Sequence, residues 1–408
     1  MMRRCGLLGE KLGHSYSPAI HGELADYEYK LYEKSPEQLE DFLKKGDWDG
    51  LNVTIPYKKT VIPFCAALSE KAAAIGSVNT LVRRPDGSIY GDNTDAYGFE
   101  KLVSRSGIRV CGKKALVLGS GGASVTVCAV LKDLGAKSVT VISREGDDNY
   151  GNLSRHADAE IIANTTPLGM YPGNGAAAVD LERFPGCEGV LDVVYNPART
   201  ALILQAERLN IPCASGLYML VAQAKRSSEL FTGGSIDDGE IDRIERKLSN
   251  AMQNIVLVGM PGSGKSTLAA LLGRALGRPV CEADEYVRQA AGMSIPEIFE
   301  RFGEKRFREL ETQALRELGK RSGAVISTGG GCVTRRENYA PLHQNGRIIW
   351  IRRDTAKLPR DGRPLSQKAD LNLLYERRRP LYERFADFTV DNNSAPGDTL
   401  MAILEALK

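Results

Sequence analysis

The chain has 408 residues, of which 42% are hydrophobic and 26% are charged, and these values are typical of a folded protein with two or three domains. Its net charge is only +3, so the sequence lacks the basic surface expected of a protein that binds nucleic acid or a membrane, and we expect neither partner. No apolar run approaches the roughly 18 residues of a membrane span. The N-terminal segment is also too poor in apolar residues for a signal peptide, so we expect a cytoplasmic protein.

The eight cysteines are scattered and form no C-x-x-C pair, which favours free thiols in a reducing compartment over disulfides or a zinc site. Only four histidines are present, so a histidine base is not expected to carry the chemistry. Glycine-rich turns, β-branched strands and amphipathic helices alternate throughout, and this order predicts an α/β fold.

Residues 1 to about 97 predict short strands at CGLLG, GLNVTI and NTLVRR, separated by helices. Three segments of this block concentrate hydroxyls, amides, a lysine and an aspartate near strand ends, where α/β proteins place their sites: 14–18, 52–59 and 78–96. A lysine beside an aspartate can supply the proton that a ketone needs on reduction. The alternative is structural, with Lys58 and Lys59 solvated at a helix start and Asp95 capping a helix.

Residues from about 112 to 215 begin with a strand, KALVLG, that runs into the glycine turn GSGGAS at 119–124 and then an apolar helix. This order is typical of a dinucleotide-binding unit, although Ser124 replaces the usual third glycine or alanine. The next strand ends at Ser143 and Arg144, where an NAD site would have a carboxylate. A cation there suits a 2′-phosphate, so the sequence favours NADP(H) over NAD, with a purely structural glycine turn as the alternative.

A polar helical stretch at 235–252 precedes the strand NIVLVG, which enters a P-loop. Gly259, Gly264, Lys265 and Ser266 meet the pattern G-x-x-x-x-G-K-[S/T], and an apolar helix follows. Backbone N–H groups of such a loop wrap the phosphates of a nucleoside triphosphate, Lys265 reaches the β/γ oxygens and Ser266 ligates Mg²⁺.

Phosphoryl transfer also needs a carboxylate near the attacking hydroxyl and cations around the transferred group. Glu282 and Asp284 follow the second strand of this region, and Arg308 and Glu311 lie one helical turn apart. Further candidates are the glycine run 329–331, Arg363 in a segment that predicts a lid, and Arg378 on a helix. Each charged residue taken singly is also compatible with a solvated surface position.

In this order, the P-loop, the paired acids, FRELE, GGG, GRPL and RRPLY resemble shikimate kinase over about 255–408. The resemblance implies a P-loop domain with a five-stranded parallel sheet and a lid, which phosphorylates the 3-hydroxyl of shikimate. It implies ATP binding by Gly262, Ser263, Gly264, Lys265, Ser266, Thr267 and Arg363. It also implies shikimate binding by Asp284, Arg308, Gly330 and Arg378, with Asp284 orienting the attacking hydroxyl or accepting its proton. Mg²⁺ is expected on Ser266, with Glu282 assisting through water where the family usually has aspartate.

Residues 5–250 resemble shikimate dehydrogenase through SxSP, NVT-x-P-x-K, VNT, GDNTD, GxGGAS, NTTPLGM and LVAQA. That family reduces 3-dehydroshikimate with NADPH, and the resemblance makes Lys58 and Asp95 the catalytic pair. It places substrate on Ser15, Ser17, Thr54, Lys58, Asn79, Asp95, Tyr195 and Gln223. It places the cofactor on Gly119, Ser120, Gly121, Gly122, Ala123, Ser143, Arg144 and Gly216.

The sequence therefore predicts three domains: a substrate-binding domain over 1–100, completed by helices at about 217–250, a Rossmann domain over 101–216, and a kinase domain over 253–408. The expected enzyme makes shikimate and then shikimate 3-phosphate with NADP(H), ATP and Mg²⁺, as a monomer or homodimer. Two alternatives remain: an NAD-dependent quinate/shikimate dehydrogenase, or a nucleotide-binding regulatory protein with one inactive domain.

Overall fold

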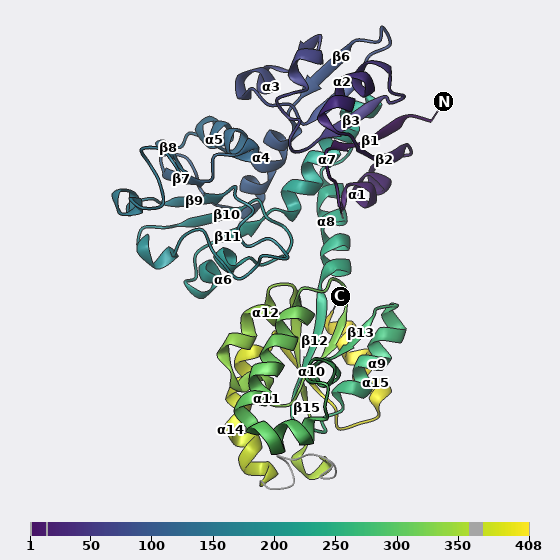
Figure 1. Cartoon of the computed structure of the whole chain (residues 1–408), viewed down its shortest axis with the longest axis vertical. Coiled ribbons are helices and arrows are strands. Elements are labelled where there is room, and N and C mark those ends of the chain that lie inside the picture. The colour runs from purple at the N-terminus through teal and green to yellow at the C-terminus, as the bar shows by residue number, and fades with distance from the viewer. Residues whose placement is uncertain (1, 14, 359–369, 408) are drawn as a thin grey trace. The chain divides into compact units, whose positions relative to one another are not determined.

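A computed structural model describes residues 2–13, 15–358 and 370–407 of the chain (Figure 1). Arg363 and the predicted lid lie outside these described residues. The chain divides into two compact units, the first formed by Met1–Met170, Ala176–Tyr195 and Leu202–Leu248, and the second by Tyr171–Gly175, Asn196–Ala201 and Ser249–Lys408. The three predicted domains stay a prediction, although the first unit contains two separate sheets and the second unit one.

The N-terminal sheet of the first unit is mixed and has the strand order β2-β1-β3-β5-β6-β4. β1 pairs with β2 and β3 in parallel, whereas β5 is antiparallel to both β3 and β6. The core beside this sheet contains Leu8, Trp48, Leu51 and Leu81, each at most 2% exposed. Its elements are β1 (Arg4–Gly9), α1 (Ser17–Leu24), β2 (Glu28–Glu33), α2 (Pro36–Lys45), β3 (Gly50–Val53), β4 (Ala67–Leu68), α3 (Glu70–Ile75), β5 (Thr80–Arg83) and β6 (Ile89–Asp92).

The second sheet of this unit is wholly parallel, in the order β11-β10-β9-β7-β8, as a Rossmann-type unit requires. Its central strands are buried on both faces, which explains why they are mostly apolar apart from one polar residue at an end of each. The elements are α4 (Thr94–Ser106), β7 (Lys114–Leu118), α5 (Gly122–Asp133), β8 (Ser138–Ile142), β9 (Ile161–Asn164), β10 (Gly189–Asp192), α6 (Ala201–Arg208), β11 (Cys213–Ser215), α7 (Leu217–Thr232) and α8 (Gly239–Met252).

The second unit has a five-stranded parallel sheet in the order β13-β14-β12-β15-β16, which confirms the predicted sheet. Helix α11 changes direction at Gly303, where φ is 75°. The elements are β12 (Asn254–Val258), α9 (Lys265–Leu276), β13 (Val280–Glu282), α10 (Ala283–Ala291), α11 (Ile295–Gly319), β14 (Val325–Ser327), α12 (Tyr339–His343), β15 (Gly346–Arg352), α14 (Leu371–Phe385), β16 (Phe388–Asp391) and α15 (Pro396–Ala406).

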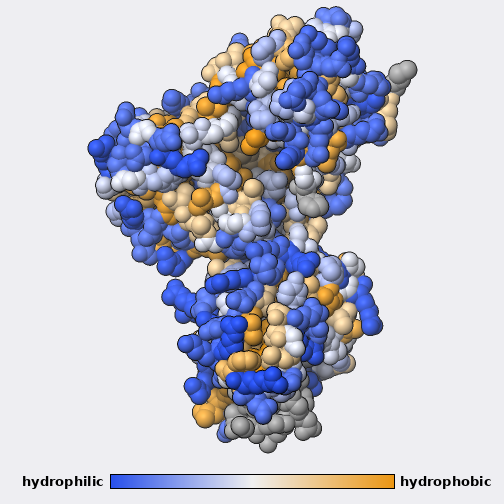
Figure 2. All heavy atoms as spheres, viewed as in Figure 1, coloured by the Kyte–Doolittle hydropathy of each residue, from blue (hydrophilic) through white to orange (hydrophobic). Residues whose placement is uncertain are grey.

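Hydrophilic side chains predominate on the face seen in Figure 2, and hydrophobic ones form small groups between them. The large exposed apolar residues include Ile55, Phe302 and Leu373. Single exposed apolar side chains are ordinary in globular proteins. In the part of the chain that is described, no helix combines the length and apolar character needed to cross a membrane.

A charge cluster with a buried centre joins α4, α7 and the segment before α8. Lys225 on α7 is only 5% exposed, and its Nζ lies 2.8 Å from both Glu229 and Asp238 carboxylate oxygens. Asp238 also accepts a hydrogen bond from Lys101 of α4 at 2.6 Å. These cations hold the pKa of Asp238 well below its usual range, chiefly through the Lys101 and Lys225 hydrogen bonds.

We expect Lys225→Met to lower the free energy of unfolding of the first unit by about 2–4 kcal/mol, because Glu229 would lose a buried partner. Lys101→Met is the matched control, since it removes a more exposed partner of the same Asp238 carboxylate and should cost less than about 1 kcal/mol. Urea denaturation followed by circular dichroism measures both changes. Equal losses for the two variants would show that burial of Lys225 is unimportant.

Candidate functional sites

The first unit contains a cavity of about 270 Å³ between its two sheets. Its walls come from the segments after β1 and β3, from α4 and α7, and from the start of α5. All eight residues predicted to bind the dehydrogenase substrate line it: Ser15, Ser17, Thr54, Lys58, Asn79, Asp95, Tyr195 and Gln223. The structure therefore brings together side chains that are up to about 200 positions apart in the sequence.

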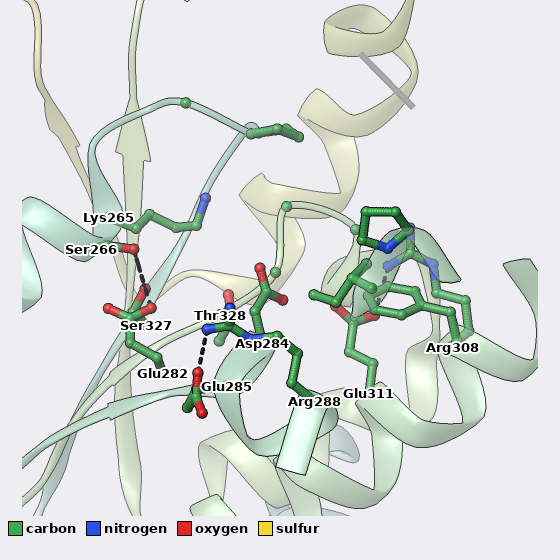
Figure 3. A pocket seen from close by; sticks show the side chains of 18 of the residues that line it. Lys265, Ser266, Glu282, Asp284, Glu285, Arg288, Arg308, Glu311, Ser327 and Thr328 are labelled. Carbon is green, nitrogen blue, oxygen red and sulfur yellow. Dashed lines mark hydrogen bonds and ion pairs between the residues drawn. The ribbon is translucent and has the colours of Figure 1, made fainter. Parts of the chain in front are cut away.

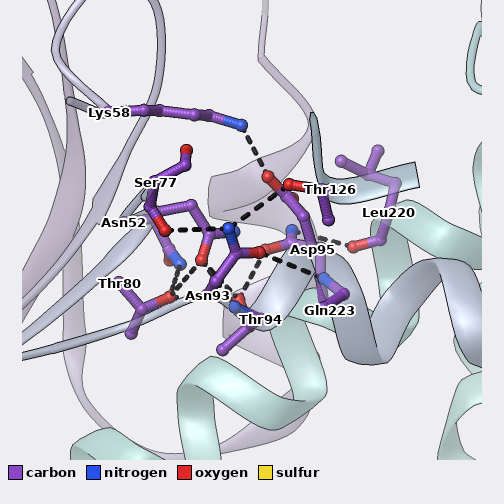
Figure 4. Close-up of polar contacts among 12 residues, drawn as sticks. Asn52, Lys58, Ser77, Thr80, Asn93, Thr94, Asp95, Thr126, Leu220 and Gln223 are labelled. Carbon is purple, nitrogen blue, oxygen red and sulfur yellow. Dashed lines mark hydrogen bonds and ion pairs between the residues drawn. The ribbon is translucent and has the colours of Figure 1, made fainter. Parts of the chain in front are cut away.

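Lys58 and Asp95 form an ion pair at the wall of this cavity, with Nζ 2.6 Å from Oδ2 (Figure 4). Their side chains are 19% and 14% exposed, so the pair is shielded but reachable. The Lys58 carbonyl accepts a hydrogen bond from the Val78 N–H at 2.8 Å, which connects the backbone at Lys58 to the segment just before β5. A shielded ammonium group beside a carboxylate can donate a proton to a bound oxygen and regain one.

Backbone geometry at the start of α4 aims Asp95 at Lys58. The Asn93 side chain caps the helix by accepting the Ala96 N–H at 3.1 Å, and the Asn79 side chain accepts the Thr94 N–H at 2.7 Å. Asp95 therefore lies in the first helical turn and is not the cap, so the structural alternative for this residue was wrong. An anionic side chain is also favourable at a helix N-terminus.

A hydrogen-bonded network lies behind the pair and was not predicted from the sequence. Asn52 donates to Ser227 Oγ at 2.7 Å, and the Thr94 hydroxyl lies 2.9 Å from the same atom. Gln223 is anchored by its Nε2, which donates to the Leu220 carbonyl at 2.9 Å (Figure 4). Asn52 also lines the cavity. Its sequence signal was its place at the start of the segment 52–59, as the first residue of the NVT motif.

The glycine turn at 119–122 connects β7 to the N-terminus of α5. Gly119 has φ 99°, and a side chain there would collide with Thr166. At Gly121 and Gly122 an added Cβ would meet nothing within 4 Å, so the turn leaves open space in front of the helix N-terminus. Open space at a helix N-terminus fits a pyrophosphate.

The other predicted cofactor residues lie around this turn. Ala123 and Gly216 line the cavity of about 270 Å³, and Ser120 is within the turn itself. Ser143 and the exposed Arg144 directly follow β8, which pairs in parallel with β7. Both strands therefore end at the same edge of the sheet, so Arg144 is on the side where the glycine turn opens.

A larger cavity, of about 860 Å³, lies in the second unit at the carboxyl ends of β12, β13 and β14. Gly262, Gly264, Lys265, Ser266 and Thr267 line it. The side chain of Ser263, within the same loop, is fully buried, and its carbonyl accepts a 2.7 Å hydrogen bond from Asn392. Lys265 is 7% exposed, and its Nζ donates to the carbonyls of Gly259 and Met260 at 2.9 and 3.0 Å.

Three oxygen-bearing side chains meet beside the P-loop. Ser266 Oγ donates to Glu282 Oε2 at 3.1 Å and lies 3.4 Å from Ser327 Oγ (Figure 3). The Glu282 side chain, which is longer than that of the aspartate usual at this position, therefore reaches the P-loop serine. Hydroxyl and carboxylate oxygens are the donors that Mg²⁺ prefers, so this set fits the ion.

A second polar group faces the same cavity from α10 and α11, where Figure 3 shows Asp284, Arg308 and Glu311 directed toward one space. Arg308 Nη1 donates to Glu311 Oε2 at 2.7 Å, and Glu304 accepts further bonds from the same guanidinium. Burial raises the pKa of Glu311, although the Arg308 charge opposes that shift. Phe299 and Phe307, with ring centroids 4.8 Å apart, add an apolar wall.

The glycine run after β14 lets these side chains approach the backbone. A Cβ on Gly331 would lie 2.2 Å from Arg308 Nη2, and one on Gly329 would lie 2.3 Å from Glu311 Oε1. The Gly330 carbonyl accepts a 3.1 Å hydrogen bond from Arg378 Nη1 and another from the Tyr382 hydroxyl. A side chain at Gly329 or Gly331 would therefore displace Glu311 or Arg308 from its observed position. Asp284, Arg308, Gly330 and Arg378 all line one cavity.

Comparison with known families finds a match for each of the two units. A family model described as shikimate dehydrogenase substrate binding domain matches residues 7–81, and one described as shikimate kinase matches residues 261–408. A shikimate dehydrogenase (NADP(+)) of Clostridium perfringens (strain SM101 / Type A) is 35% identical over 268 residues, covering 60% of this chain and 98% of the relative.

Two solved structures resemble the first part of the chain. A chorismate mutase/shikimate 5-dehydrogenase fusion protein from Clostridium acetobutylicum has a TM-score of 0.58 at 38% identity, covering 61% of this chain and 97% of that one. Shikimate 5-dehydrogenase from Thermus thermophilus, in complex with NADP(H) and shikimate, has a TM-score of 0.55 at 29% identity, covering 60% of this chain and 99% of that one.

Proposed function

Because the chain belongs to the shikimate dehydrogenase family over its first 60% and carries a shikimate kinase domain, we propose that it catalyses two consecutive reactions. The first is the NADPH-dependent reduction of 3-dehydroshikimate to shikimate, and the second is the ATP-dependent phosphorylation of shikimate on its 3-hydroxyl. One observation carries this proposal: the Lys58–Asp95 pair and the P-loop each open into a cavity lined by the other residues that the respective chemistry needs.

In the first reaction Lys58 acts as the proton donor. The glycine turn at 119–122 would hold NADPH, which would supply the hydride for the ketone carbon. Lys58 Nζ gives its proton to the carbonyl oxygen, which becomes the new hydroxyl, and Asp95 stabilises the ammonium form to which the lysine returns. The hydroxyl and amide groups of Ser15, Asn79 and Gln223 hold the polyol in place.

In the second reaction the 3-hydroxyl oxygen of shikimate attacks the γ-phosphorus of ATP. The new O–P bond forms as the bond to the β–γ bridging oxygen breaks, and ADP leaves. Asp284 orients the hydroxyl and takes its proton, while Arg308 and Arg378 bind the carboxylate of shikimate through guanidinium N–H groups. Lys265 must turn from the carbonyls of the loop toward the phosphates when ATP is bound.

Ser266 and Glu282 would hold Mg²⁺ in this cavity, with Ser327 beside them. The ion would neutralise charge on the β- and γ-phosphates. We further propose three functional parts within the chain: residues 1–100 with about 217–250 for the polyol, 101–216 for the dinucleotide, and 253–408 for the kinase reaction.

One coupled assay tests the whole proposal. Supplying 3-dehydroshikimate, NADPH and Mg-ATP to the full chain should yield shikimate 3-phosphate, detected by mass spectrometry. Omission of NADPH should abolish the product, and omission of ATP should stop the reaction at shikimate. Comparing NADH with NADPH in the reduction, and quinate with shikimate in the reverse oxidation, distinguishes this activity from that of a quinate/shikimate dehydrogenase.

Separate loss of the two activities is expected from two substitutions. Lys58→Ala should slow NADPH-dependent reduction by about 10²-fold or more, because the proton donor is lost. Asp284→Asn should slow phosphorylation by about 10²-fold because the hydroxyl loses its base. Each variant should keep the other activity, and loss of both by either variant in a folded protein would contradict the two-site assignment.

Removal of the Arg144 cation is expected to weaken NADPH binding specifically. Arg144→Ala should raise KM for NADPH about tenfold, since it deletes a charge-assisted contact to the 2′-phosphate, while KM for NADH should stay within about twofold. Lys137→Ala, just before the opposite end of β8, is the control. An unchanged ratio of the two KM values would show that Arg144 does not bind the 2′-phosphate.

Removing the Glu282 carboxylate beside Ser266 is expected to change the metal requirement of the kinase. Glu282→Ala should raise the Mg²⁺ concentration for half-maximal phosphorylation by about tenfold. Glu285→Ala is the control, because Glu285 lines the same cavity but pairs with Arg288. An identical Mg²⁺ titration for wild type and Glu282→Ala would exclude Glu282 from the metal site.

A further inference from the structure

Arg353 is a cation in the kinase cavity that the proposed phosphoryl transfer does not use. It directly follows β15, which pairs in parallel with β12, the strand that leads into the P-loop. The two strand ends are in close contact, since a Cβ on Gly259 would lie 2.4 Å from the Ile351 carbonyl oxygen. Arg353 therefore emerges beside the P-loop, and its side chain lines the cavity.

The guanidinium of Arg353 is poorly satisfied by the protein. Among the described residues its hydrogen bond is to the Gly262 carbonyl, from Nη1 at a long 3.4 Å. Its Nε is shielded from solvent and has no hydrogen-bond partner in that part of the chain. Arginine stays charged in proteins, so an unpaired, shielded N–H group is costly unless a ligand supplies an acceptor.

The sheet order indicates which ligand this is. Asp284 follows β13 and the glycine run follows β14, both on one side of β12, whereas Arg353 follows β15 on the other side. The groups for the phosphoryl acceptor therefore lie away from Arg353, and the P-loop lies next to it. Within the cavity, the Arg353 position favours the nucleotide over the polyol.

We propose that Arg353 binds the phosphate chain of the nucleoside triphosphate as a further side-chain cation, together with Lys265. This inference rests on the proposed kinase function of the cavity. When ATP enters, phosphate oxygens accept from the guanidinium, and the weak contact with the Gly262 carbonyl becomes secondary. A planar guanidinium suits this role because it donates several hydrogen bonds to phosphate.

Equilibrium binding of Mg-ATP and Mg-ADP to the full chain, with kinase kinetics in parallel, tests the inference. Arg353→Gln removes the charge but keeps an N–H donor for Gly262, and Arg353→Lys keeps the charge. We expect Arg353→Gln to weaken ATP binding and raise KM for ATP by about tenfold or more, with KM for shikimate within about twofold. Arg353→Lys should recover most of the ATP affinity.

Arg352→Ala is the matched control. Arg352 is the preceding residue, pairs with Asp391 at 2.5 Å and does not line the cavity, so its removal should leave ATP binding unchanged. NADPH-dependent reduction should be unaffected in every variant. If Arg353→Gln binds ATP as wild type does, or if Arg353→Lys is as weak as Arg353→Gln, the inference is overturned. A wild-type chain that binds ATP but does not phosphorylate shikimate would contradict the proposed function instead, and the binding comparison would still decide the role of Arg353.

Discussion

Parallel strands end at a common edge, and the cofactor turn and the kinase cavity both depend on this constraint. In the Rossmann sheet β7 and β8 deliver the glycine turn and Arg144 to one edge. In the kinase sheet β12, β13 and β14 deliver the P-loop, Asp284 and the glycine run to one cavity. Short loops then suffice for chemistry, because the sheet has already brought together residues that are distant in the sequence.

In the kinase cavity, the buried ion pair of Arg308 and Glu311 is already formed in the absence of substrate. Glu311 is fully buried and bonded to Arg308, so the guanidinium cannot swing away from the cavity without leaving an uncompensated carboxylate. The glycines after β14 complete this arrangement, since a side chain on Gly331 would occupy the place of the guanidinium. The pair and the turn therefore fix one another, which lowers the reorganisation needed when a carboxylated substrate binds.

Local sequence predicted the features that are themselves local. The P-loop, the glycine turn and the five-stranded kinase sheet depend on contiguous patterns, and the predicted substrate residues of both sites face cavities. Asn52, Ser227 and Arg353 were not predicted, because each acquires its contact only when separate elements pack. Asp95 was open to interpretation as a helix cap until the structure showed Asn93 in that position. A cap and its neighbour have similar sequence signatures, and only the backbone geometry separates them.

The two cavities differ in the charge of the side chains that they offer to the polyol. Among the described lining residues of the smaller cavity, Lys58 and Asp95 are the charged ones, and both are engaged in a common ion pair. Recognition of the substrate in the smaller cavity must therefore come from hydroxyl and amide groups. The larger cavity presents Arg308 and Arg378 and must also hold a triphosphate, which accounts for its volume of about 860 Å³ against about 270 Å³. Stronger charge recognition in the kinase is consistent with its need to position an acceptor hydroxyl against a highly anionic donor, where repulsion has to be overcome before transfer begins.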